Sequence, residues 1–314
     1  MGSAGLMVGQ ILGQLPACLL LFRDIWKKEK NLIKKSVHFG SIKRLLIRYK
    51  KFPLFSTWSS LMNTSSVHLP VLLLAVFFSP AAVGQYTLAN RVLMAPVSII
   101  GSAISQAFLQ KAIEENRKER LGEFSLLVFR KLLAFGFIPL ILLSIAAPEL
   151  FNVAFGPEWE KAGLYVQFLS VWVLFVFISS PLSSIFNILE LQKENLFFNS
   201  LLFLSRLIVL LIGGFLGNDV LTIALFGITG AILWFYHVIW LLKLAGVHFK
   251  VTITSLLTEA GVGLPFFLAA AALKFLIKSD VLLIVLLMAV LMVFVLYRFK
   301  EFVINTGKRK GVTM

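Results

Sequence analysis

The stretch ELFNVAFGPEWEKAG, from Glu149 to Gly163, separates two long apolar runs and carries four of the 45 formally charged side chains of the chain. Three of these four side chains are acidic, although the whole chain has a net charge of +15. The preceding Pro148 and the Gly156-Pro157 pair predict a break in helical structure. We therefore interpret the stretch as a loop between two helices, on a side of the molecule that accepts acidic residues.

The composition excludes a water-soluble fold. The 314 residues are 59% hydrophobic and 14% charged, with a mean hydropathy of +0.90, whereas soluble domains average about 45–50% apolar and about 25% charged residues. The apolar residues form continuous blocks instead of the alternating strands of a membrane barrel, which predicts helices. We expect an all-α integral membrane protein with about nine transmembrane helices. The predicted spans are Ala4–Phe22, Ser56–Phe78, Val83–Leu109, Leu132–Ala147, Leu164–Leu189, Leu196–Leu216, Val220–Leu242, Ala260–Ile277 and Val281–Leu296.

The lysines and arginines predict the topology. Of the 30 basic residues, 25 fall in alternate loops or in the C-terminal tail, and only Lys161 and Lys278 fall in the loops of the opposite side. Cytoplasmic loops carry the excess of basic residues, so we expect the C-terminus to be cytoplasmic and the opening stretch to lie outside. The same pattern explains the basic charge without nucleic acid as a partner.

Nine spans with a cytoplasmic C-terminus put the first residue outside, although no secretory signal peptide is recognisable. We therefore expect an odd number of helices upstream of this sequence. The single cysteine, Cys18, permits no intrachain disulfide.

The loop after the first span contains the segment SIKRLLIRYKKF (Ser41–Phe52). Its apolar residues recur at helical spacing, and lysines and arginines occupy the remaining positions. This pattern predicts a basic amphipathic helix on the inner leaflet, with anionic membrane lipids as its partner. A solvated basic loop is the alternative interpretation.

Two predicted spans carry polar faces. Ser59, Asn63 and Ser66 share one face of the second span, with His68 following, and the fifth span has a similar face. Such faces line a cavity or form hydrogen bonds between helices, and both interpretations stay open. The residues that we select as substrate-binding candidates from these two faces are Asn63, Ser66, His68, Ser180, Ser184 and Asn187.

Charged residues within the spans are the sharper signal, because a charge at membrane depth is costly and marks a functional site by default. Arg206 lies near the middle of its span, and Arg91 lies closer to an end. Both are substrate-binding candidates, because guanidinium groups suit phosphate. Lys274 is expected to extend to the outer headgroups. We find no catalytic constellation, no metal-ligand spacing and no nucleotide-binding glycine loop, and we predict neither an enzyme nor a cofactor.

Three segments in combination resemble the second half of bacterial polysaccharide export flippases, the oligosaccharide and O-antigen flippases of the multidrug/oligosaccharidyl-lipid/polysaccharide exporter superfamily. These segments are YTLANRVLMAPVSIIGSAISQAF (Tyr86–Phe108), FRKLLAFGFIPLILLSIAAPELFNVAFGPEWEKAG (Phe129–Gly163) and ISSPLSSIFNILELQ (Ile178–Gln192). The resemblance implies two bundles of six helices that face each other across a cavity. It also implies movement of an undecaprenyl-diphosphate-linked oligosaccharide across the bacterial cytoplasmic membrane by alternating access, for capsule, O-antigen or exopolysaccharide synthesis.

In the two-bundle fold that the resemblance implies, residues 1–22 are the last helix of an absent N-terminal bundle and residues 23–55 form the basic loop. Residues 56–245 form the six-helix C-terminal bundle, residues 246–298 form two extra helices, and residues 299–314 form a basic cytoplasmic tail. The implied partners are the lipid-linked oligosaccharide and a polysaccharide polymerase. A drug or cation antiporter and a peptidoglycan-precursor flippase of the same superfamily remain alternatives, as does a membrane enzyme or assembly partner of a polymerase.

Overall fold

The computed structural model describes residues 19–30, 39–50 and 52–310, together with residues 9, 13 and 16. The chain separates into two compact units, Met1–Leu54 and Phe55–Met314. The regular structure of the described residues is helical throughout, without a strand. This confirms the prediction of an all-α integral membrane protein.

In the first unit, helix α2 (Phe39–Arg48) overlaps the segment predicted to be a basic amphipathic helix, but it begins two residues earlier and ends four residues earlier. Leu45 and Leu46 of this helix are exposed, as are its basic side chains Lys43, Arg44 and Arg48. The predicted first span, Ala4–Phe22, lies largely outside the described residues.

The second unit contains helices that are long and apolar enough to cross a membrane, and eight such segments occur among the described residues. The helices that form them are α3 (Thr57–Phe77), α4 (Pro80–Arg117), α5 (Leu121–Phe155), α6 (Glu160–Leu182) with the short α7 (Ile185–Ile188), α8 (Gln192–Phe215), α9 (Asp219–Leu244), α10 (Phe249–Leu276) and α11 (Asp280–Lys310). They correspond in order to the second to ninth predicted spans.

Several helices extend well beyond the predicted spans. Helix α5 has 35 residues, where the hydrophobic run predicted only Leu132–Ala147. The break predicted at Pro148 is wrong, because α5 continues through this proline and ends at Phe155. Hydropathy marks the apolar part of a helix, while backbone hydrogen bonding continues into polar turns.

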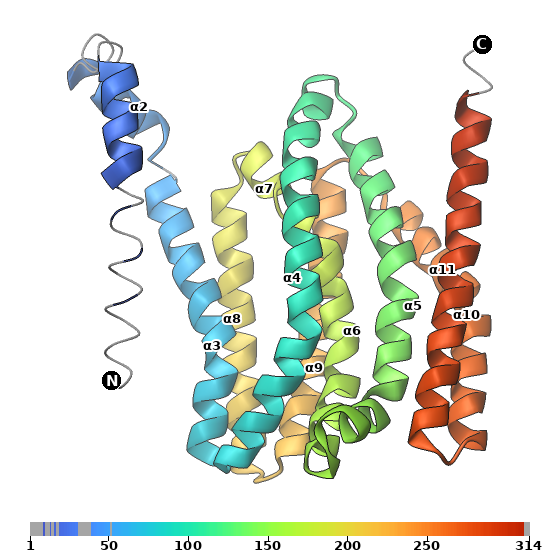
Figure 1. Cartoon of the computed structure of the whole chain (residues 1–314). Coiled ribbons are helices and arrows are strands. Elements are labelled where there is room, and N and C mark those ends of the chain that lie inside the picture. The colour runs from blue at the N-terminus through green and yellow to red at the C-terminus, as the bar shows by residue number, and fades with distance from the viewer. Residues whose placement is uncertain are drawn as a thin grey trace. The chain divides into compact units, whose positions relative to one another are not determined.

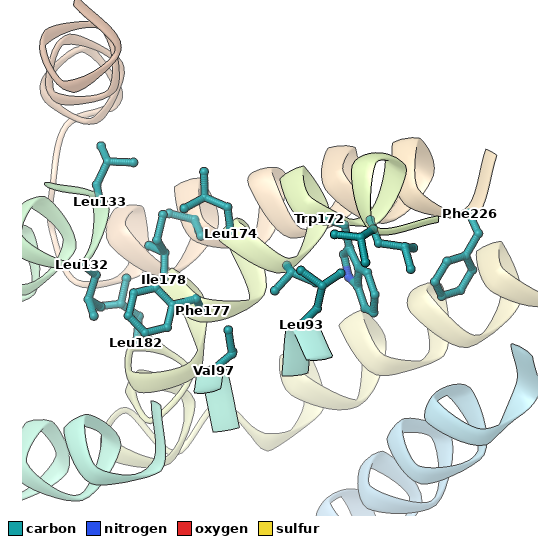
Figure 2. Close-up of a cluster of buried hydrophobic side chains, with 14 of the residues drawn as sticks. Leu93, Val97, Leu132, Leu133, Trp172, Leu174, Phe177, Ile178, Leu182 and Phe226 are labelled. Atoms are coloured by element: carbon teal, nitrogen blue, oxygen red, sulfur yellow. The ribbon is translucent and has the colours of Figure 1, made fainter. Parts of the chain in front are cut away.

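Helix α6 lies at the centre of the second unit, where it packs against α4, α5 and α9. Its side chains Leu169, Val173 and Ile178 are fully buried. Figure 2 shows part of this core, with Trp172 and Phe177 of α6 among leucines and valines of the neighbouring helices. Helix α3 packs mainly on α8, and α8 packs on α9.

Helices α10 and α11 pack against α5 and against each other (Figure 1). Lys274 of α10 donates to the Ile145 carbonyl at 2.7 Å and forms an ion pair with Glu149 at 3.0 Å. Asn152 donates to Asp280 at the start of α11, at 2.8 Å. Lys274 therefore binds the end of α5.

The acidic stretch is a junction between helices. Gly156 adopts a φ of 104°, a conformation that favours glycine, and this residue ends α5 before the 3-10 turn Pro157–Trp159. Lys161 then pairs with Asp219 of α9 at 2.5 Å, and Gln85 of α4 donates to the Glu158 carbonyl at 2.6 Å. The polar residues that interrupt the apolar sequence thus tie α5, α6, α4 and α9 together at one end.

Candidate functional site

The interface between α3 and α8 holds the polar contacts of the candidate site. Asn199 of α8 donates to the Ser59 hydroxyl at 2.8 Å and also contacts Asn195 one turn away. Further along the same interface, Arg206 donates through Nη1 to the Ser66 hydroxyl at 2.9 Å. Part of the polar face predicted for α3 therefore forms hydrogen bonds between helices.

Arg206 is buried among aromatic rings. Only 6% of the residue is exposed, and its position nine residues before Phe215 puts it about 14 Å from the end of α8, at about 1.5 Å per residue. Its Cζ atom lies 5.4 Å from the ring centre of Trp172 and 5.3 Å from that of Phe226; Figure 2 shows both rings. Such contacts stabilise a buried cation.

The charge of Arg206 has no acidic partner among the residues that the structure describes. Its bonds go instead to the hydroxyl and the carbonyl of Ser66, at 2.9 and 3.1 Å, and its buried Nε has no hydrogen-bond partner in the described part of the chain. A buried charge without a counterion is costly, so this arrangement marks Arg206 as the most unusual ionisable group of the α3–α8 interface.

Asn63, His68 and Arg91 lie elsewhere, with exposed side chains. Arg91 is eleven residues after the start of α4, or about 16 Å along its axis, and His68 is nine residues before the end of α3, or about 14 Å. Both residues therefore lie at least two helical turns from the nearer end of their helices. No hydrogen bond or ion pair joins Arg91 to another described residue.

The candidates from the fifth predicted span lie around the end of α6. Ser180 is half-buried, and its hydroxyl lies 3.5 Å from that of Ser105 in α4. Ser184 is half-buried before α7, and Asn187 within α7 is exposed. The structure thus brings Ser66 and Arg206 together and leaves the remaining candidates apart from this pair.

His237 of α9 is a polar residue that sequence reasoning missed. It is 2% exposed and stacks on Phe198 with 3.7 Å between ring centres. Neither ring nitrogen has a hydrogen-bond partner among the described residues. Its sequence context, WFYHVIW (Trp234–Trp240), is aromatic and lacks a periodic polar pattern, so the only available signal was a histidine within an apolar run.

A cleft of about 490 Å³ lies beside the turn between α4 and α5. Glu115, which lines it, is 7% exposed and pairs with Arg120 at 2.9 Å. This pair links the end of α4 to the start of α5, and we interpret it as part of the turn. Among the described residues, no group of histidine, cysteine, aspartate or glutamate side chains could hold a metal ion.

These features define a multi-pass α-helical membrane protein whose spans carry both buried and exposed polar groups. The family model for polysaccharide biosynthesis proteins matches residues 1–164. The chain therefore belongs to the polysaccharide biosynthesis protein family. Family and fold together point to a transporter-type protein involved in polysaccharide synthesis or export, rather than to an enzyme. Comparisons with curated proteins and with solved structures gave no match.

Proposed function

We propose that the protein is part of a flippase that moves polyprenyl-diphosphate-linked oligosaccharide units across the bacterial cytoplasmic membrane. Membership of a polysaccharide biosynthesis family and eight spans in the described residues support transport of a polysaccharide precursor. The protein moves this substrate by alternating access.

The observation that carries the proposal is an exposed cation within a helix that is long and apolar enough to span the membrane. Arg91 lies about 16 Å along α4 from its start, and a charge that faced lipid within an apolar span would be strongly unfavourable. His68 and Asn63 are also exposed on the neighbouring α3. Exposed polar and charged groups within such helices fit a hydrated path better than a lipid contact.

The chemistry of these candidate residues suits the substrate. A lipid diphosphate needs a positive charge where it leaves the headgroup region, and a guanidinium group binds phosphate oxygens in a bidentate manner. Amide and hydroxyl groups, such as those of Asn63, Ser180, Ser184 and Asn187, can form hydrogen bonds with sugars while the lipid tail stays in the bilayer. Arg206 and Ser66 contact substrate in this scheme only when α3 and α8 separate, because they bond to each other.

The same proposal includes the location and the topology of the protein. The protein resides in the inner membrane with a cytoplasmic C-terminus, and residues 56–245 form one of two bundles. Helix α2 lies on the inner leaflet, where Lys43, Arg44 and Arg48 attract anionic lipids and Leu45 and Leu46 enter the bilayer. A polysaccharide polymerase takes up the translocated units.

The test uses a strain that lacks the gene and carries variants at wild-type abundance. Lipid-linked oligosaccharides are labelled on each leaflet. We expect Arg91→Gln to accumulate them on the cytoplasmic leaflet and Arg91→Lys to do so less. Lys193→Gln is the matched control, because Lys193 is an exposed cation at the start of α8. Normal export with Arg91→Gln would remove Arg91 from the substrate path, and normal export in the deleted strain would reject the function.

A further inference from the structure

Helix α3 contains an interior proline at a buried position. Pro70 has no backbone N–H, so it cannot donate to the carbonyl of the residue four positions earlier. That residue is Ser66, which is 1% exposed. The Ser66 carbonyl therefore loses its partner within the helix. It needs a donor from elsewhere, because a backbone carbonyl without a hydrogen bond is costly in lipid or in a protein interior.

Arg206 supplies the missing donor from another helix. Its Nη1 lies 3.1 Å from the Ser66 carbonyl oxygen and 2.9 Å from the hydroxyl of the same residue. The buried guanidinium group of Arg206 thus replaces the absent N–H of Pro70 as the hydrogen-bond donor to this carbonyl. The contact joins α3 to α8 at the one point where the hydrogen bonding of α3 is interrupted by a proline.

We propose that Arg206 is a positioning residue that latches α3 to α8 at the Pro70 interruption. While Nη1 is bonded to Ser66, the two helices are fixed at this level. When the bonds open, α3 bends at Pro70, because no helix hydrogen bond restrains the Ser66 carbonyl. This bending moves the half of α3 that carries Asn63 and changes the polar surface that α3 presents.

The partners of Arg206 suit a contact that opens and closes. It binds a neutral carbonyl and a neutral hydroxyl, and within the described residues it has no carboxylate partner that would have to be left behind as a buried unpaired charge. Trp172 and Phe226 lie within about 5.4 Å of the guanidinium carbon on other helices, α6 and α9, so they continue to stabilise the cation when α3 moves. The role of this movement in transport rests on the proposed function.

A double-mutant cycle tests the latch without any substrate. Thermal denaturation of the purified protein in detergent is measured for Arg206→Met in the wild-type and in the Pro70→Ala background. Alanine at position 70 restores the N–H that bonds to the Ser66 carbonyl. We therefore expect the loss in denaturation midpoint caused by Arg206→Met to shrink to less than half in the Pro70→Ala background. An equal loss in both backgrounds would overturn the proposal.

Pro96→Ala is the matched control, because Pro96 is an interior proline of α4 and the bonds of Arg206 go to α3. It should leave the loss caused by Arg206→Met unchanged. If Arg206→Met alone yields no folded protein, recovery of monodisperse protein becomes the readout. Recovery with Pro70→Ala and none with Pro96→Ala supports the latch, and any other pattern rejects it.

Two further measurements separate a latch from ordinary packing. Hydrogen exchange should rise in the α3 peptide around Ser66 for Arg206→Lys and return to the wild-type level when Pro70→Ala is added. The Arg206→Met, Pro70→Ala protein should fold normally but translocate well below the wild-type rate, and a wild-type rate would reject the movement. Because the cycle needs no substrate, coupling between the two sites would survive a failure of the flippase proposal.

Discussion

The hydroxyl group of Tyr165 offers a sharp test of how the acidic stretch joins α6 to α9. Tyr165 is fully buried and donates to Asp219 at 2.8 Å, and the same carboxylate oxygen accepts from Lys161 at 2.5 Å. Tyr165→Phe removes this hydroxyl and keeps the packing of the ring. The carboxylate retains Lys161 and the backbone N–H of Val220, at 2.8 Å, so the substitution deletes one hydrogen bond and leaves no unpaired charge.

A hydrogen bond to a charged group contributes about 1.5–3 kcal/mol. Because Asp219 keeps its other partners, we expect a loss at the lower end, about 1.5 kcal/mol. On the scale of soluble domains of 150–250 residues, this corresponds to a fall of about 3–6 °C in the denaturation midpoint. The assay is thermal denaturation in detergent, followed by near-ultraviolet circular dichroism.

Tyr236→Phe is the matched control, because Tyr236 lies on α9 with 48% of its surface exposed and makes no hydrogen bond with another described residue. Its midpoint should stay at the wild-type value. A shift of less than about 1 °C for Tyr165→Phe would refute the reasoning, because a 1.5 kcal/mol loss would give several degrees. It would mean that Lys161 and the Val220 N–H hold the carboxylate without help from the tyrosine hydroxyl.

Three other predictions concern stability and membrane contact. His237→Phe should leave the denaturation midpoint unchanged or raise it, because phenylalanine keeps the ring stacking and removes two ring nitrogens without partners among the described residues. Gly163→Ala should destabilise the protein strongly, because an added Cβ would lie 2.4 Å from the Pro148 Cα. A bimane label at Leu46 of α2 should emit at shorter wavelength in nanodiscs of anionic lipid than in zwitterionic nanodiscs.

Each of these predictions has a direct counter-result. A lower midpoint for His237→Phe would reveal a polar partner such as buried water. Gly84→Ala controls for Gly163→Ala, because a Cβ at Gly84 meets nothing within 4 Å and alanine favours helix by about 1 kcal/mol; equal effects of the two substitutions would contradict the packing argument. Identical label spectra in both kinds of nanodisc would exclude the anionic leaflet as the partner of α2. So would a spectral difference that disappears only at low salt, because electrostatic attraction is strongest there.

Much of the fold could be predicted because lipid imposes a length on apolar runs. Hydropathy located α3, α8 and α9 to within a few residues of their ends. It failed at α4 and α5, which continue far past the apolar residues, because helical hydrogen bonding does not stop where the membrane does. The break that proline chemistry predicted at Pro148 was also wrong, since α5 continues through this proline.

The candidate site was predictable only residue by residue. Arg206 stood out because a charge at membrane depth is rare, but its partner Ser66 is 140 residues away in sequence, and nothing local sets the register of α3 against α8. Helical periodicity put Ser59, Asn63 and Ser66 on one face. Packing then divided that face, because Ser59 and Ser66 meet α8 while Asn63 stays exposed. Tertiary contacts, which have no local signature, decide such divisions.

The central claim is that this protein translocates a lipid-linked oligosaccharide. The most direct measurement uses the purified gene product in liposomes that contain a polyprenyl-diphosphate-linked oligosaccharide, and follows its exposure on the opposite leaflet with a membrane-impermeant lectin. The account predicts exposure that is faster than in protein-free liposomes and slowed by Arg91→Gln. Exposure at the protein-free rate, from a folded preparation that includes any companion chain, would contradict it.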